Sequence, residues 1–189
     1  MFAKIHDARL RLRRRADLHQ QSKGTMNSER YDKAAIWLHW VVAAMVLAQF
    51  ATGWLWGFFE RGSEPRFYLF RIHIVIGTII LVAAVLRTGW RLTHPAPPLP
   101  AEMRPAHVVL ARLTHGLLYL AILVQPVLGL LTITAFGKSI GRWPRDLHLS
   151  LSYIIALIVA VHVAAAFWHQ YLRKDGLLLR MVPRRVPRT

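Results

Sequence analysis

Hydrophobic residues gather in four long windows along the chain, and charged residues crowd between these windows. The windows cover about residues 34–58, 70–90, 108–134 and 147–171. Each window reaches the ~20 apolar residues that a helix needs to cross the hydrocarbon core of a bilayer. Tryptophans lie near several window ends, as they do in the aromatic belt of a membrane protein. The pattern predicts an all-α fold, an integral membrane bundle of four helices.

The positions of the charged residues predict how the bundle is oriented in the membrane. The net charge is +16, which in a soluble protein would favour nucleic-acid binding. Here 19 of the 25 Lys and Arg residues lie on the side of the bundle that holds both termini, and 6 lie on the other side. The positive-inside rule therefore predicts cytoplasmic N- and C-termini. We expect the lipid bilayer, and no nucleic acid, as the surroundings.

The segments outside the windows divide the chain into three parts. Residues 1–30 form a basic tail that predicts disorder near anionic lipid, and Met26 is an alternative start just before the first window. Residues 31–183 hold the four windows, and residues 184–189 form a basic C-terminal tail. The segment HPAPPLPAEMRP is too rich in proline for a helix or strand, so it predicts a linker between the second and third windows.

The residues that carry chemistry inside the windows are histidines. The chain has no cysteine, which excludes Fe–S clusters, thiolate ligation of haem and the C-x-x-C-H attachment of c-type haem. The windows contain no Asp or Glu, although proton or cation transporters use carboxylates there. Neutral imidazoles in a dry setting suit non-covalent haem. The candidates are His39, His73, His115, His148, His162 and His169.

Spacing and depth arrange four of these histidines in two pairs. His162 follows His148 by 14 residues, which returns a helix to within about 40° of its starting direction and about 21 Å further along the axis. The two side chains should therefore share a face, one near each membrane surface. Depth then pairs His39 with His162 on the cytoplasmic side, and His73 with His148 on the outer side. Each pair predicts bis-imidazole ligation of one iron.

The same helical period places further residues at the depths of the two histidine pairs in the membrane. Gly53 follows His39 by 14 residues, and Gly77 lies one turn after His73; glycines there would let a flat macrocycle approach the backbone. Arg87 follows His73 by 14 residues, and Arg91 comes one turn later. Guanidinium groups at the cytoplasmic level would pair with haem propionates. On the outer side, the corresponding candidates are Arg71, Arg142 and Arg145.

Simpler interpretations of these residues stay open at this point. A single histidine near a span end is more often an interfacial residue than a ligand, and glycines in a span often serve helix packing. Arg87 and Arg91 also fit the role of positive-inside anchors. His115 is the rival of His39 as a ligand. His169 lies seven residues after His162 and shares its predicted face.

Several segments of the chain carry a family resemblance. They are WLHW in the first window, RIHIVIG in the second, RTGWRLTHPAPPLP after it, LTHGLLYL in the third, and DLHLSLSY with VHVAAAFWHQYLRKDGLLLRMVP in the fourth. Together they resemble bacterial cytochrome b561 over about residues 31–183. The resemblance implies a multi-pass inner-membrane protein with two b haems, held by histidines that match His39, His73, His148 and His162. It leaves His115 and His169 as supporting or quinone-site residues.

The resemblance also implies single-electron transfer between a partner at one membrane face and the quinone pool of the respiratory chain, with ubiquinone as the expected substrate. Two other functions remain in view. One is an enzyme that oxidises superoxide or another small periplasmic donor and reduces quinone. The other is a haem-bearing membrane anchor subunit of a dehydrogenase or hydrogenase complex. A haem-free role in metal handling is less consistent with windows that lack Cys, Asp and Glu.

Overall fold

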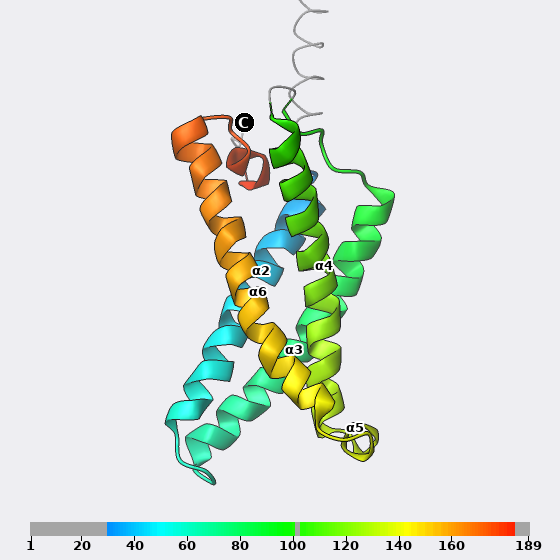
Figure 1. Ribbon diagram of the computed structural model, residues 1–189, viewed down its shortest axis with the longest axis vertical. Helices are drawn as coiled ribbons and strands as arrows, with labels where there is room; N and C mark the ends of the chain where they lie inside the picture. Colours follow the sequence, from blue (N-terminus) through cyan, green and yellow to red (C-terminus); the bar gives the residue numbers. More distant parts are fainter. Residues whose placement is uncertain (1–29, 101–102, 184–189) are drawn as a thin grey trace, which may run out of the picture.

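The computed structural model describes residues 30–100 and 103–183, and every regular element in these ranges is a helix (Figure 1). The elements are α2 (Lys33–Leu55), η1 (Trp56–Phe58), α3 (Glu64–Thr93), α4 (Pro105–Ile133), α5 (Ala135–Ser139), α6 (Trp143–Phe167), η2 (Trp168–Arg173) and η3 (Leu178–Met181). The basic tails predicted for residues 1–30 and 184–189 lie outside the described residues, apart from Arg30.

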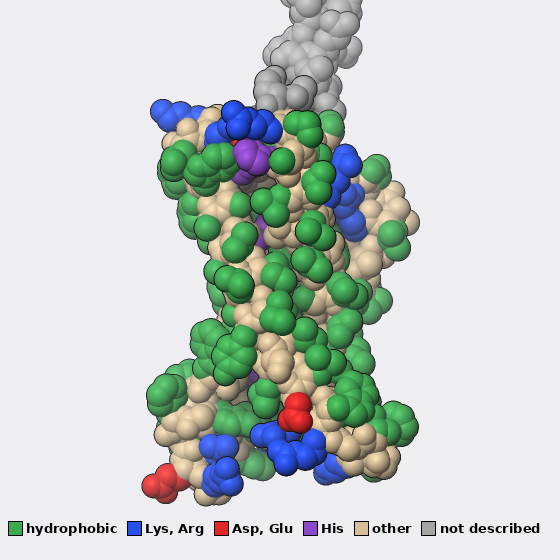
Figure 2. Space-filling model, in the orientation of Figure 1, with side chains coloured by type: hydrophobic (Ala, Val, Ile, Leu, Met, Phe, Trp, Pro, Cys, Tyr) green, Lys and Arg blue, Asp and Glu red, His purple; other side chains and the backbone are tan. Residues whose placement is uncertain are grey.

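Four stretches are long and apolar enough to cross a membrane, which confirms the predicted number of spans. They are Lys33–Phe58, Glu64–Thr93, Pro105–Ile133 and Trp143–Arg173. At most 17% of the apolar window in any of them is buried inside the protein. Figure 2 shows the consequence, a waist of hydrophobic side chains with Lys and Arg gathered towards the two ends. Such a surface is suited to contact lipid chains rather than water.

Local chemistry explains where the helices begin. Asp32 caps α2, because its carboxylate accepts a hydrogen bond from the backbone N–H of Ala35 at 2.8 Å. Proline occupies the first turn of α3, α4 and α6, where its missing N–H costs nothing. Helix α3 begins at Glu64, six residues before the apolar window, so its first turns lie beyond the span predicted from hydrophobicity alone. The short helix α5 between α4 and α6 was not predicted.

Helix packing joins neighbours along the chain. Helix α2 packs against α3, α3 against α4, and α4 against α6. Small residues mark the closest contacts: Gly77 is buried against Gln49, and Ala84 is fully buried. In Figure 1, α2 and α3 meet in a hairpin at the bottom of the view, and α4 and α6 meet there through α5. We call this the hairpin end of the bundle.

The opposite end of the bundle holds the start of α2 and the end of α6, and we call it the terminal end. The indole N–H of Trp40 donates to the carbonyl of Met181 at 2.6 Å, which ties η3 to α2. Arg180 donates to the carbonyl of Pro98 at 2.6 Å, so η3 also contacts the proline-rich linker. Up to Arg104, the described part of this linker has neither helix nor strand, as predicted, and its last residue, Pro105, begins α4.

Candidate functional site

Two histidines from different helices face each other at each end of the bundle. At the hairpin end, the imidazoles of His73 (α3) and His148 (α6) have ring centres 6.3 Å apart. At the terminal end, His39 (α2) and His162 (α6) also have ring centres 6.3 Å apart. These are the pairs predicted from spacing and depth. We call them the hairpin pair and the terminal pair.

The separation within each pair suits a metal ion held between two imidazoles. Metal–nitrogen bonds of about 2 Å, with about 1.1 Å from each nitrogen to its ring centre, put the centres about 6 Å apart when imidazole, metal and imidazole are collinear. The planes within the pairs lie at 67° and 84° to each other. His115 also approaches His162, with ring centres 5.3 Å apart. That distance is too short for the collinear arrangement, which favours His39 over its rival.

Hydrogen bonds orient both imidazoles of the hairpin pair. His148 Nδ1 lies 3.0 Å from the carbonyl oxygen of Gln125, which can only accept, so Nδ1 carries the proton. His73 Nδ1 lies 3.1 Å from the hydroxyl of Thr52. That hydroxyl is 3.0 Å from the carbonyl of Ala48 and donates its own hydrogen there. Both neutral rings therefore keep Nε2 free to bind a metal ion. Sequence reasoning missed Thr52 and Gln125.

Glycines lie against the imidazoles of the hairpin pair. A Cβ at Gly53 would lie 3.2 Å from His73 Cε1, so the imidazole lies close to the backbone there. A Cβ at Gly129 would lie 3.0 Å from His148 Cε1, which sequence reasoning missed. Gly77 faces the side chain of Gln49 instead of a histidine. Its role in the structure is close helix packing, the alternative left open from the sequence.

At the terminal end, Arg87 accompanies the terminal pair. Arg87 Nη2 lies 3.2 Å from His39 Nδ1, and Nη1 is buried with no hydrogen-bond partner among the described residues. Arg87 and Arg91 line one small cavity together with Tyr31 and Tyr119. Burial raises the pKa of Tyr31 above its usual value, so this phenol stays a neutral donor. Two guanidinium groups and a phenol would suit carboxylates such as haem propionates.

An aromatic cluster adjoins the hairpin pair. The Trp56 ring centre lies 6.2 Å from that of His73. Arg66 stacks over the Trp56 ring at 5.6 Å and donates to the carbonyls of Trp56 and Phe59 at 3.2 and 2.9 Å. Trp56 and Arg66 border an open cavity of about 520 Å³. The outer arginines predicted from the sequence, Arg71, Arg142 and Arg145, are exposed at the same end.

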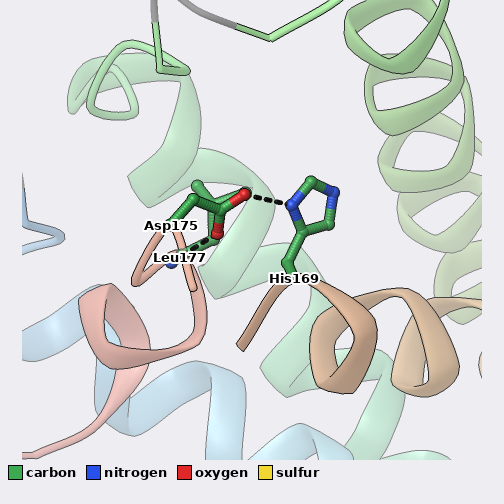
Figure 3. A network of polar contacts seen from close by, with 3 residues as sticks. All are labelled: His169, Asp175 and Leu177. Carbon is green, nitrogen blue, oxygen red and sulfur yellow. Dashed lines mark hydrogen bonds and ion pairs between the residues drawn. The ribbon is translucent and has the colours of Figure 1, made fainter. Parts of the chain in front are cut away.

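A histidine–carboxylate pair lies at the terminal end, outside the terminal pair. His169 Nδ1 donates to the carboxylate of Asp175, which also accepts from the backbone N–H of Leu177 at 3.3 Å (Figure 3). After Phe167 the chain continues as a π-helix, η2, which carries His169. Asp175 was not predicted as a functional residue.

The residues around the two pairs fit b-type haem. Each pair supplies two imidazoles at the separation of axial ligands, glycines leave room beside the hairpin pair, and Arg87 has a buried nitrogen that lacks a partner. No group of three or more His, Asp or Glu side chains gathers as a metal site in residues 30–100 and 103–183.

Comparison with known proteins identifies the family of the chain. A family model described as prokaryotic cytochrome b561 matches residues 30–184. Cytochrome b562 of Cereibacter sphaeroides is 34% identical over 156 residues, which cover 80% of this chain and 94% of the relative. Cytochrome b561 homolog 1 of Escherichia coli is 30% identical over 177 residues, which cover 82% of this chain and 98% of the relative.

A third relative carries a more specific name. The probable superoxide oxidase CybB of Yersinia pestis is 28% identical over 174 residues, which cover 83% of this chain and 98% of the relative. These matches extend over almost the whole length of each relative, and the family model covers all four spans of this chain. The chain belongs to the prokaryotic cytochrome b561 family, whose members are multi-pass, haem-binding electron-transport proteins of bacterial membranes.

Proposed function

We propose that the protein carries two non-covalent b haems and passes single electrons along the bundle between a donor at the hairpin end and quinone at the terminal end. His73 and His148 would hold one haem, and His39 and His162 the other. The observation that carries the proposal is the repetition of one geometry, with the same 6.3 Å between ring centres in both pairs. The charge distribution supports cytoplasmic termini in the inner membrane.

The residues of the chain have separate roles in this function. Haem held by two imidazoles would supply one-electron transfer and would leave no free position for O₂. Thr52 and Gln125 keep the hairpin imidazoles in the tautomer that leaves Nε2 free. Arg87 and Arg91 provide positive charge for haem carboxylates at the terminal end. Lipid around the bundle keeps water away from both sites.

Quinone chemistry needs protons as well as electrons, and the terminal end offers a residue pair suited to deliver them. His169 is half-buried near the end of the fourth span, and its Nδ1–H is held by Asp175 (Figure 3). The other ring nitrogen of His169 is then an acceptor or donor for a quinone oxygen, according to its protonation. We propose this pair as the hydrogen-bonding site for the quinone head group.

The test is a redox-titrated visible spectrum with a measured ratio of haem to protein. We expect two haems per chain, one haem per chain in His148→Ala, and one in His162→Ala. His94→Ala is the matched control, because His94 stacks on Trp90, outside both pairs, and it should keep two haems. A wild-type preparation without haem from haem-replete cells would refute the function. Loss of no haem in either pair variant would refute the assignment of ligands.

The exposed arginines at the hairpin end support a second candidate function. The hairpin end carries exposed arginines, among them Arg71, Arg142 and Arg145, and one relative is named a probable superoxide oxidase. Positive charge at this end would raise the local concentration of a small anion such as superoxide. The protein would then be an enzyme that oxidises this donor and reduces quinone.

Proteoliposomes that contain quinone separate the two candidates. A superoxide source outside the vesicles should produce quinol with the wild-type protein if the second candidate holds. The triple variant R71Q/R142Q/R145Q should then slow this reaction more at low ionic strength than at high, because salt screens the steering charge. A pure relay would show no quinol under superoxide and would need a protein donor.

A further inference from the structure

The two histidine pairs have the same separation but different partners on their rings. At the hairpin pair, both imidazoles donate Nδ1–H to a neutral oxygen: His73 to Thr52 at 3.1 Å, and His148 to Gln125 at 3.0 Å. A hydrogen-bond acceptor on Nδ1–H makes an imidazole a more basic, more electron-donating ligand. Such ligands stabilise ferric iron over ferrous iron, and this lowers the midpoint potential.

The terminal pair has the opposite surroundings. The group nearest to His39 Nδ1 is the guanidinium of Arg87, with Nη2 at 3.2 Å. A guanidinium is permanently charged and has no acceptor. In the structure the guanidinium therefore donates to His39 Nδ1. Binding of a metal ion through Nε2 would place a proton on Nδ1, and Arg87 would then face it as a cation and not as an acceptor. No hydrogen bond from His162 Nδ1 to an oxygen is present in the described structure either.

The charge of Arg87 is poorly compensated within the protein. No carboxylate of the described residues forms an ion pair with it, and its Nη1 is buried without a partner. Its other close neighbour is the Tyr119 ring, 5.4 Å away. A cation in a site of low dielectric disfavours the extra positive charge of ferric iron. The surroundings would therefore favour ferric iron at the hairpin pair and ferrous iron at the terminal pair.

We propose that Arg87 sets the order of the two midpoint potentials. The haem held by His39 and His162 would have a more positive potential than the haem held by His73 and His148. The inference rests on the proposed di-haem function. It gives electron flow a direction: electrons that enter at the hairpin end move downhill to the terminal end. There they arrive at the end of the bundle that holds His169 and Asp175. Arg87, which is carried by α3, would thus act through its charge on the potential of the haem beside it.

A redox titration of the visible spectrum in the wild-type protein and four variants tests the order. Arg87→Gln removes the charge and should lower the midpoint of the higher-potential component while the lower one stays. Arg87→Lys keeps the charge and should retain the wild-type midpoint. Thr52→Val removes the acceptor on His73 with little change of shape and should raise the lower-potential component. Arg91→Gln is the charge control: its guanidinium donates to the carbonyl of His94, and it should shift the higher component less than Arg87→Gln.

Three results would overturn the order. They are a shift of the lower component in Arg87→Gln, no shift of either component, and a shift of the higher component in Thr52→Val. The haem-to-protein ratio is measured for every variant. If Arg87→Gln loses haem, the component that disappears still decides, because it must be the higher-potential one, whereas Thr52→Val must shift the lower-potential one. A wild-type protein with one haem would overturn the proposed function together with this inference, whereas two haems with the wrong response would overturn the inference alone.

Discussion

His148 and Gln125 form a reciprocal clamp between α6 and α4. The imidazole Nδ1–H of His148 donates to the backbone carbonyl of Gln125 at 3.0 Å, and the side-chain amide of Gln125 donates back to the carbonyl of His148 at 2.8 Å. One hydrogen bond fixes the tautomer and the plane of the ring, and the other fixes the backbone that carries it. The position of this imidazole is therefore set by α4, a helix that supplies no histidine to either pair.

The first prediction concerns Gly129, one turn beyond Gln125 on α4. In Gly129→Ala the new Cβ would lie 3.0 Å from Cε1 and 3.3 Å from Nδ1 of His148, so the clamped ring would have to shift. Overpacking of this kind costs about 1–3 kcal/mol. We expect the haem-to-protein ratio to fall towards half of the wild-type value, with the loss in the lower-potential component.

Gly116→Ala is the matched control for this change. Gly116 lies on the same helix, and a Cβ there meets nothing within 4 Å. It should keep full haem and gain about 0.5–1 kcal/mol of stability from the higher helix propensity of alanine. Equal haem content in Gly129→Ala and Gly116→Ala would show that the ring of His148 has room to move, against the clamp described above.

The second prediction concerns Arg66 at the hairpin end. Its guanidinium donates to the carbonyls of Trp56 and Phe59, which holds the turn between α2 and α3 and the Trp56 ring near His73. Removing hydrogen bonds from a charged donor costs about 1.5–3 kcal/mol. Arg66→Gln should therefore lower the midpoint temperature at which the Soret absorbance is lost, whereas Arg61→Gln, at an exposed residue of the same turn, should not. Equal midpoints for the two variants would contradict the proposed role.

The sequence was sufficient for the helices and for the histidine pairs, because both depend on regularities of a straight helix. Apolar length predicts a span, and 14 residues return a side chain such as His162 to the face of His148. It was insufficient for contacts between helices that are distant in sequence. Gln125 and Gly129 have no pattern that points to His148, because their role comes from the packing of α4 on α6. Their small or amide side chains also fit ordinary packing.

Departures from regular helix account for the remaining differences. His169 pairs with Asp175, because the left-handed residue Lys174, with φ of 57°, turns the chain back after the π-helix η2. A hydrophobicity pattern carries no signal for a π turn, because the change affects hydrogen-bond register and not composition. The ring partner Thr52 was missed for a related reason: threonine in a span usually bonds its own helix, and Thr52 does so as well.

The third prediction concerns the pH dependence of stability at Asp32. Partial burial opposes ionisation, but hydrogen bonds from the Ala35 N–H and the Trp90 indole outweigh it and hold the pKa of Asp32 below its ordinary value of 3.8. The folded state therefore favours the carboxylate, and this contribution is present above pH 3.8 and lost as the pH falls through the lowered folded value.

Asp32→Asn removes the charge and keeps a capping side chain. A negative charge at a helix N-terminus is worth about 0.3–1 kcal/mol, so at pH 6 the wild-type protein should melt about 1–4 °C above the variant. This difference should disappear as the pH falls through the lowered folded-state pKa of Asp32. Other carboxylates titrate in both proteins, so only the difference between the two melting curves is informative. A difference that is independent of pH would mean that the charge of Asp32 does not act in this way.

The last prediction concerns the pair formed by His169 and Asp175. If His169 passes protons to bound quinone, removal of its carboxylate partner frees the ring to rotate and weakens proton transfer, a contribution of about 10²–10⁴-fold in other enzymes. Asp175→Asn and His169→Ala should each slow the oxidation of reduced protein by a soluble quinone analogue by about tenfold or more. Both variants should keep two haems and unchanged midpoints, since neither residue belongs to a histidine pair.

Asp146→Asn provides the control for this experiment, because Asp146 lies in the first turn of α6, at the opposite end of the bundle. It should oxidise at the wild-type rate. A stopped-flow measurement at several pH values adds a second test: the rate of the wild-type protein should depend on pH, and that of His169→Ala should depend on it much less. Full haem with wild-type rates in both Asp175→Asn and His169→Ala would mean that quinone reacts elsewhere, and His115, which lies beside His162, would become the residue to replace next.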